Sequence, residues 1–269
     1  MTTPDFTLLD AVRLRRPLIH CVSNIVSAGD CANLALAVGA SPVMAQAPEE
    51  MAAIAAASAS AVLNTGTPDG EKFRACLLCG RETARRGHPV ILDPVGVGAS
   101  PWRLEGVEAL LAAFTPSLLR VNLGEAQALL GLESREQGVD SPAAASLTQR
   151  AETARRLARQ RKTAVLLSGP EDVATDGDAL FQIPGGSAQM TRITGTGCML
   201  SVLCGVFAAV ERDPLAAAVA AAAFWKLCSR RAERLADCRG PGSFRAALLD
   251  AAGTLTAADC ARETRVQRL

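Results

Sequence analysis

The sequence predicts a layered α/β protein with a mostly parallel central sheet and helices on both faces. Two observations carry this prediction. Short β-leaning runs alternate with longer Ala- and Leu-rich segments through most of the 269 residues. The short runs are also continuously apolar rather than alternating, which is typical of parallel strands that are covered on both faces. No linker, repeat or low-complexity run divides the chain, so we expect a single domain over residues 1–269.

Five apolar runs are expected to be strands: Pro17–Ser23, Ala61–Gly66, Pro89–Gly96, Ser117–Leu123 and Thr163–Gly169. Four helices are expected among them: Ser27–Val38, Pro48–Ser58, Asp69–Arg86 and Trp102–Phe114. Gly39 and Gly87 follow two of these helices, where a left-handed residue commonly ends a helix.

The second part of the chain is expected to differ from the first. Glu171–Ile183 contains Asp-Gly between two apolar runs, which predicts a β-hairpin. The rest is expected to be mainly helical, at Gly197–Glu211, at Pro214–Cys238 and from about Gly242. This order predicts a late hairpin followed by a helical C-terminal part.

Composition excludes several classes of function. With 28 basic and 27 acidic residues the net charge is +1, which argues against nucleic-acid or anionic-membrane binding. Nine cysteines without a recognisable signal peptide favour a reduced, cytoplasmic protein with buried thiols. The alanine-rich run PLAAAVAAAAFWKLC is too short to predict a membrane span.

Polar and glycine residues gather at the carboxyl ends of all five expected parallel strands: Ser23-Asn24, Asn64-Thr65-Gly66, Asp93-Pro94, Asn122 with Glu125, and Ser168-Gly169. In open α/β sheets the ligand crevice lies beyond the carboxyl ends of the strands. One or two such ends are explained by turns, but five favour a functional site.

Gly195-Thr196-Gly197 stands directly before an apolar helix that has Cys198 in its first turn. Unpaired N–H groups and the helix dipole make such a start a candidate anion site. The alternative is a tight loop that enters a buried helix. Likewise, the dipole can lower the pKa of the Cys198 thiol, or the side chain can simply pack as a small apolar residue. A P-loop is excluded because GxxxxGK[ST] does not occur.

Two carboxylates near strand ends are candidate site residues. Asp93 ends a strand and can hold water around a magnesium ion, which prefers oxygen ligands and keeps several waters. If Gly124 begins a helix, Glu125 lies in the first turn, where the alternative role is helix capping.

The remaining cysteines and His20 are assigned to packing. Cys76 and Cys79 form a single CxxC within an expected helix, with neither a second pair nor HxxxH, so zinc is not expected. His20 lies inside an apolar strand and is expected to be a satisfied core histidine. Four further thiols are expected in the core: Cys204, Cys228, Cys238 and Cys260.

The chain resembles the hydroxyethylthiazole kinases. The blocks that carry the resemblance run in that family's order over residues 17 to 250: HCVSNIVSAGDCAN, GASPVMAQAPEE, LNTGT, ILDPVGVGAS, RVNLGE, GVDS, LLSGPEDVATDG, ITGTGCML and GPGSF. The resemblance implies a ribokinase-like fold, a homotrimer with active sites between subunits, and transfer of phosphate from ATP to a thiazole alcohol in thiamine salvage.

The resemblance also assigns roles to residues. Asn24, Met44 and Gly195 would bind the alcohol. The nucleotide would be bound by Arg120, Ser168, Thr196 and Gly197. Asp93 and Glu125 would lie near Mg²⁺, and Cys198 takes the place where other ribokinase-like kinases carry a catalytic aspartate.

Four positions depart from the family's usual residues. Val121 stands for Gly, Ser168 for Thr, Gln46 for His and Gly29 for Asn. Gln46 and Gly29 border the expected alcohol site, so a kinase of another heterocyclic alcohol, such as hydroxymethylpyrimidine, is the first alternative. A nucleotide-binding protein without catalysis and a cysteine hydrolase using Cys198 are the others.

Overall fold

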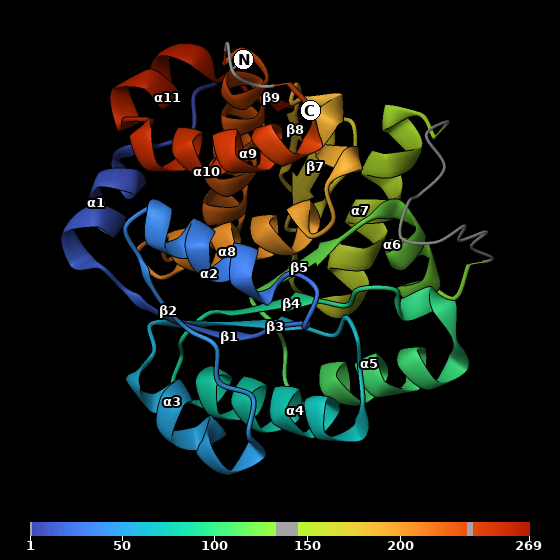
Figure 1. The fold of residues 1–269 in the computed structure, drawn as a ribbon. Coiled ribbons are helices and arrows are strands. Elements are labelled where there is room, and N and C mark those ends of the chain that lie inside the picture. Colours follow the sequence, from blue (N-terminus) through green and yellow to red (C-terminus); the bar gives the residue numbers. More distant parts are fainter. Residues whose placement is uncertain (1, 133–144, 236–238) are drawn as a thin grey trace.

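The computed structural model describes residues 2–132, 145–235 and 239–269, and its strands form one sheet of nine (Figure 1). The spatial order is β2-β1-β3-β4-β5-β6-β7-β8-β9. The strands are β1 (Leu18–Val22), β2 (Ser41–Val43), β3 (Ser60–Asn64), β4 (Val90–Asp93), β5 (Leu118–Val121), β6 (Ala164–Leu167), β7 (Asp172–Thr175), β8 (Leu180–Ile183) and β9 (Gln267–Arg268).

The six strands from β2 to β6 pair in parallel, and β7 to β9 are antiparallel. All five parallel strands predicted from the sequence are present, and so is the β7–β8 hairpin, whose turn holds Gly177 at φ 105°. The short strands β2 and β9 were not predicted, because runs of three and two residues show no periodicity.

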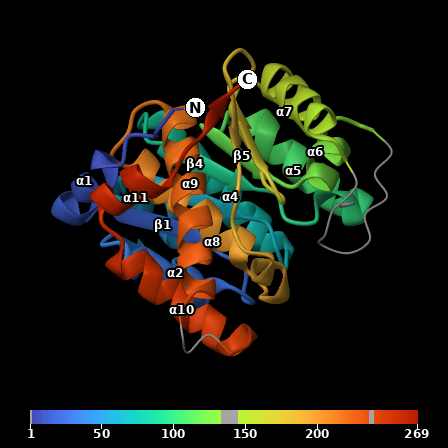
Figure 2. The ribbon, with the colours of Figure 1, turned by 90° about the horizontal axis from the view of Figure 1, so that it is seen from above.

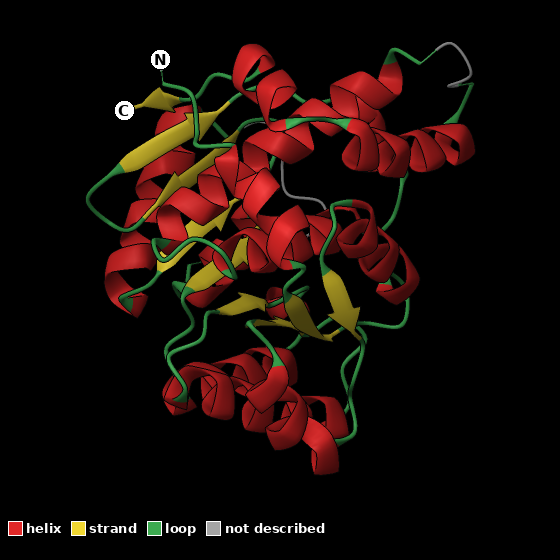
Figure 3. Cartoon of the chain, turned by 90° about the vertical axis from the view of Figure 1, so that its left-hand side faces the viewer, coloured by secondary structure: helices red, strands yellow, loops and turns green. Residues whose placement is uncertain are grey.

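Two layers of helices enclose the sheet (Figures 1 and 3). One face is covered by α1 (Thr7–Arg15), α2 (Ala28–Ala37), α8 (Thr196–Ala208), α9 (Pro214–Glu233), α10 (Pro241–Thr254) and α11 (Ala257–Glu263). The other is covered by α3 (Met51–Ala57), α4 (Gly70–Arg85), α5 (Pro101–Ala113), α6 (Leu123–Leu129) and α7 (Leu147–Arg161). Both faces of the central strands are therefore buried, which explains their continuously apolar sequence.

The helices predicted before the hairpin are confirmed, and Gly39 and Gly87 have the expected positive φ of 98° and 72°. Helices α1 and α7 were not predicted, whereas α6 was considered as a possible helix that begins at Gly124. Helix α9 ends at Glu233 rather than Cys238, and Cys238 lies outside the described residues, as does the GVDS block. None of the helices in the described ranges has both the length and the hydropathy needed to cross a membrane.

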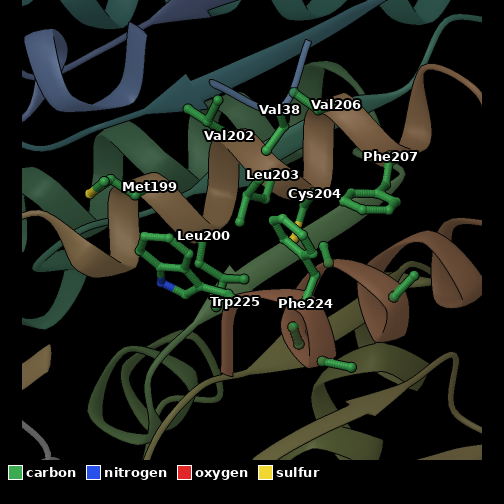
Figure 4. Packing of buried hydrophobic residues seen from close by; sticks show 14 of the residues in the cluster. Val38, Met199, Leu200, Val202, Leu203, Cys204, Val206, Phe207, Phe224 and Trp225 are labelled. Carbon is green, nitrogen blue, oxygen red and sulfur yellow. The ribbon is translucent and has the colours of Figure 1, made fainter. Parts of the chain in front are cut away.

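Helix α8 is the element that positions the site. Phe207 of α8 packs against Phe224 of α9 with ring centroids 6.0 Å apart (Figure 4). A Cβ on Gly205 would lie 2.4 Å from Val62, so this glycine lets α8 approach the sheet closely. Figure 2 shows α8, α9 and α10 stacked over the sheet, with α6 and α7 on the side of the hairpin. This packing places the N-terminus of α8 at the carboxyl ends of the parallel strands.

Candidate active site

The predicted strand-end residues meet beside the start of α8. Asn64 and Asp93 end neighbouring strands and are register partners. The Nδ2 of Asn64 donates to Asp93 Oδ2 at 2.8 Å, and the Ser201 hydroxyl of α8 donates to the same oxygen at 2.7 Å. Asp93 is fully buried, so these donors replace the water that its carboxylate gives up.

Arg120 joins this carboxylate to the end of the next strand. One guanidinium nitrogen lies 3.4 Å from Asp93 Oδ1, and the other donates to the Ser168 hydroxyl at 2.6 Å. Burial opposes the charge, but the carboxylates of Asp93 and Glu125 outweigh it and raise the pKa of Arg120. A Cβ on Gly197 would lie 2.6 Å from this guanidinium, so the charge rests directly against the first turn of α8.

The N-terminus of α8 has the form of an anion site. Gly195 precedes it at φ 85°, and within the described chain no side chain caps it. A Cβ on Gly195 would lie 2.7 Å from Ser27 Cβ, so both its φ and its surroundings require glycine. The Thr196 carbonyl accepts from the Trp225 indole at 3.2 Å, which anchors the turn to α9. The helix dipole adds about half a positive charge to the cation of Arg120.

Cys198 lies half-buried in this turn, and the Nδ2 of Asn24 donates to its sulfur at 3.2 Å. Of the two alternatives for this thiol, a pKa lowered by the helix dipole is not found in this structure. Burial raises the pKa, and the negative charge of Asp93 raises it further against the opposing effects of Ser27, Arg120 and Asn64. The physical reason is that this helix start lies inside the protein beside a carboxylate rather than at an exposed end.

The alternative role of Glu125 as a helix cap is confirmed. Its Oε2 accepts from Asn122 N at 2.8 Å in a capping box at the start of α6, and its Oε1 accepts from Gly96 N at 3.0 Å. Burial raises the pKa of Glu125 to about 7, with Asp93 adding to the rise and Arg120 opposing it.

These carboxylates fit a hydrated magnesium ion better than a directly ligated one. Within the described ranges no three His, Cys, Asp or Glu side chains are arranged to hold a metal. The oxygens of Asp93 and Glu125 already face Arg120, Asn64 or backbone N–H groups. Hard oxygen acceptors of this kind suit Mg²⁺, which keeps several of its waters.

Met44 directly follows β2, is half-buried and packs on the α8 side of the core. The adjacent Ala45 carbonyl is 3.2 Å from His20 Nε2, and Cys79 Sγ is 3.2 Å from His20 Nδ1. Burial lowers the pKa of His20, with only partial opposition from Ala45 and Glu50. The prediction of a satisfied core histidine is confirmed, and Cys79 of the CxxC is its partner.

Two buried lysines were not predicted as part of the site. Lys72 donates to the carbonyls of Ser23 and Gly66, and so joins the loops that follow β1 and β3. Lys226 lies 3.2 Å from Asp172 Oδ1 and donates to the Gly169 carbonyl at 2.8 Å, just after Ser168. The rarity of lysine could have indicated these two residues: the chain has three lysines, and two of them lie within predicted helices.

Cys204, Cys228 and Cys260 are buried in the core, as predicted.

The comparisons agree with this geometry. A family model described as the hydroxyethylthiazole kinase family matches residues 9–258. The chain is 43% identical to a hydroxyethylthiazole kinase of Listeria monocytogenes over 92% of this chain and 91% of the relative. It is 42% identical to one from Methanoculleus marisnigri, over 97% and 92% of the two chains.

Solved structures share the fold of this chain. A hydroxyethylthiazole kinase protein from Pyrococcus horikoshii OT3 aligns over 98% of both chains, with a TM-score of 0.89 and 31% identity. A pyridoxal kinase from Staphylococcus aureus, at 14% identity and a TM-score of 0.66, covers 94% of this chain and 98% of its own, and shares the fold.

Proposed function

Because the chain belongs to the hydroxyethylthiazole kinase family, we propose that it transfers the γ-phosphoryl group of ATP to the hydroxyl of 4-methyl-5-(2-hydroxyethyl)thiazole. One observation carries the proposal at the level of this chain. Arg120, Asp93 and Cys198 converge on the uncapped first turn of α8, which provides cation, carboxylate and thiol in one place. We take residues 1–269 as one kinase domain.

The nucleotide phosphates would bind at the start of α8. The N–H groups of Thr196 and Gly197 and the guanidinium of Arg120 supply positive charge there, and the Ser168 hydroxyl lies beside that guanidinium. Phosphoryl transfer depends mainly on positioning and on neutralising the charge of the migrating group. Arg120 is buried and the other three residues are partly buried, so little water screens the guanidinium.

The alcohol would lie on the opposite side of Cys198. Asn24, Met44 and Gly195 would hold it so that its hydroxyl meets the sulfur. In its thiolate form, Cys198 would accept the hydroxyl proton and become a thiol as the phosphoryl group arrives, a contribution of about 10²–10⁴-fold in typical general-base catalysis. In the unliganded protein the thiol is the favoured form, because burial and Asp93 raise its pKa. Arg120 and the dipole of α8 favour the thiolate.

Magnesium would be held near Asp93 and Glu125 through its own water molecules. When bound, it would neutralise phosphate charge, as divalent ions do in other phosphotransferases. The two carboxylates would orient those waters, while Asn64, Ser201 and the backbone keep the carboxylates in place.

A coupled ADP-release assay tests the function. We expect ADP production that depends on the thiazole alcohol, with a higher kcat/KM than with hydroxymethylpyrimidine. A clear preference for the pyrimidine would overturn the substrate and would point to the substitutions at Gln46 and Gly29. If neither alcohol caused ADP release, the result would favour a nucleotide-binding protein without catalysis.

We also propose a cytoplasmic homotrimer that acts in thiamine salvage, with each site completed by a neighbouring subunit. Ile25 and Val26 are exposed apolar residues next to Asn24, which supports a subunit contact beside the alcohol site. Light scattering of the active enzyme tests the trimer, and a stable, active monomer would contradict it.

A further inference from the structure

Asp93 and Cys198 are connected by a chain of two side-chain amides. Asn64 Nδ2 donates to Asp93 Oδ2 at 2.8 Å, Asn24 Nδ2 donates to Asn64 Oδ1 at 3.0 Å, and the same Asn24 nitrogen lies 3.2 Å from Cys198 Sγ. Both asparagines are buried, with 3% and 4% of their surface exposed for Asn64 and Asn24. This series of hydrogen bonds joins the ends of β1, β3 and β4 to the first turn of α8.

Backbone groups determine which way each amide points. Gly66 N–H donates to Asn64 Oδ1 at 2.9 Å, so the other end of that amide, facing Asp93, must be the NH₂ group. The N–H groups of Val26 and Ser27 both donate to Asn24 Oδ1 at 3.0 Å, which leaves its NH₂ group toward Cys198. A backbone N–H can only donate, so neither amide can be reversed without losing a hydrogen bond.

The sulfur therefore always faces a donor. A thiol that accepts from Asn24 directs its own S–H away from that amide, and a thiolate in the same place gains a hydrogen bond that favours the charged form. Asn64 also acts on the sulfur directly, because its side chain favours the thiolate and opposes the rise in the pKa of Cys198, and its Oδ1 accepts from the Asn24 amide that contacts the sulfur. A second part of its effect on Cys198 passes through Asn24.

We propose that Asn64 is a positioning residue for phosphoryl transfer, which holds Asn24 so that its NH₂ group donates to the Cys198 sulfur and keeps that sulfur ready to accept the substrate proton. This inference rests on the proposed function, because it deepens the role assigned to Cys198. A positioning role of Asn64 differs from a purely structural role in one measurable respect. If Asn64 only satisfied buried polar groups, its loss would act equally with and without the thiol.

A double-mutant cycle measures this difference. The variants are Asn64→Ala, Cys198→Ala and the double substitution. We expect Asn64→Ala to lower kcat by about tenfold, with the KM for ATP changed by less than about twofold. In the Cys198→Ala background the same substitution should lower kcat by a clearly smaller factor, because only the support of Asp93 is then lost and residues that act as a unit are not additive. An equal loss of kcat in both backgrounds would overturn the proposal.

A second measurement does not depend on turnover. Iodoacetamide reacts with thiolates, and peptide mass spectrometry isolates the labelling of Cys198 from that of the other cysteines. We expect Asn64→Ala to slow labelling of Cys198 at a fixed pH, because the sulfur loses its fixed donor. Unchanged or faster labelling would overturn the proposal.

Asn33→Ala provides the matched control. Asn33 is exposed on α2, and its replacement should change neither kcat nor labelling. The failure of the proposed function is also distinguishable: a wild-type enzyme without thiazole-dependent ADP release would refute the kinase activity, while the labelling experiment would still decide the role of Asn64.

Discussion

The two sides of Cys198 are built from different chemistry. On the side of α2 and β3, the groups next to the sulfur are neutral amides, from Asn24 and Asn64. On the side of β5 and β6, buried charges dominate, from Arg120 and Lys226 with their acidic partners. The first arrangement suits the orientation of an uncharged alcohol, and the second suits the binding of phosphates.

This difference teaches how one sheet edge can serve two substrates. Neutral amides provide direction at small electrostatic cost, because they bury no net charge. Buried cations provide attraction, but each needs a carboxylate or several carbonyls to remain stable without water. Substitutions on the two sides should therefore affect different kinetic and thermodynamic quantities.

The largest effect is expected at Cys198, which lies between the two sides. Cys198→Ala should lower kcat by about 10²–10⁴-fold, the usual range for a lost proton acceptor, while ATP still binds. Cys198→Asp should retain or increase turnover, because it restores an acceptor. Steady-state kinetics with nucleotide-binding titrations check both. A fully active alanine variant would exclude the general base and leave the kinase assignment intact.

On the charged side, Lys226→Met should lower the free energy of unfolding by about 3–5 kcal/mol, because Asp172 would remain buried without its partner. The variant should also raise the KM for ATP, since the Gly169 carbonyl loses its donor beside Ser168. Urea unfolding and ATP kinetics measure the two effects. Lys162→Met, at an exposed lysine, is the control and should match the wild type.

Arg120→Lys tests the phosphate-binding charge with less disturbance of the fold. Lysine keeps a cation near Asp93 but cannot reach Asp93 and Ser168 together as the planar guanidinium does. We expect kcat/KM for ATP to fall by about 10–100-fold, in line with the loss of a charge-assisted hydrogen bond. The exposed Arg81 provides a control as Arg81→Lys, and an equal loss there would contradict the specific role of Arg120.

The smallest effect is expected at His20, which contacts the carbonyl of Ala45 next to Met44. Burial lowers its pKa in the folded protein, so the unfolded chain binds the proton more readily. The contribution to stability is therefore complete above the unfolded pKa of about 6.5 and is lost as the pH falls below it, by up to about 1.4 kcal/mol per pH unit. Urea unfolding at several pH values measures this loss. His20→Gln should remove the extra dependence, and an identical pH profile in both proteins would contradict the assignment.

Much of this site was predictable because local patterns report local structure. Continuous apolar runs indicated the parallel strands, and the polar residues that follow them indicated where Asn24, Asp93 and Ser168 would meet. Glu125 was recognised as a candidate cap because it would lie in the first turn of a helix that begins at Gly124. The orientation of the two amides was not predictable, because it depends on backbone donors such as Gly66 N–H that come close only after folding.

The sequence alone determined the layered α/β architecture, the family and the set of polar residues at one sheet edge, because periodicity and motifs are local properties of the chain. The tertiary structure alone decided that Arg120 lies against Gly197, that Asn64 reaches Cys198 through Asn24, and that burial raises rather than lowers the thiol pKa. These properties arise from contacts between segments far apart in sequence, and from the removal of water around them.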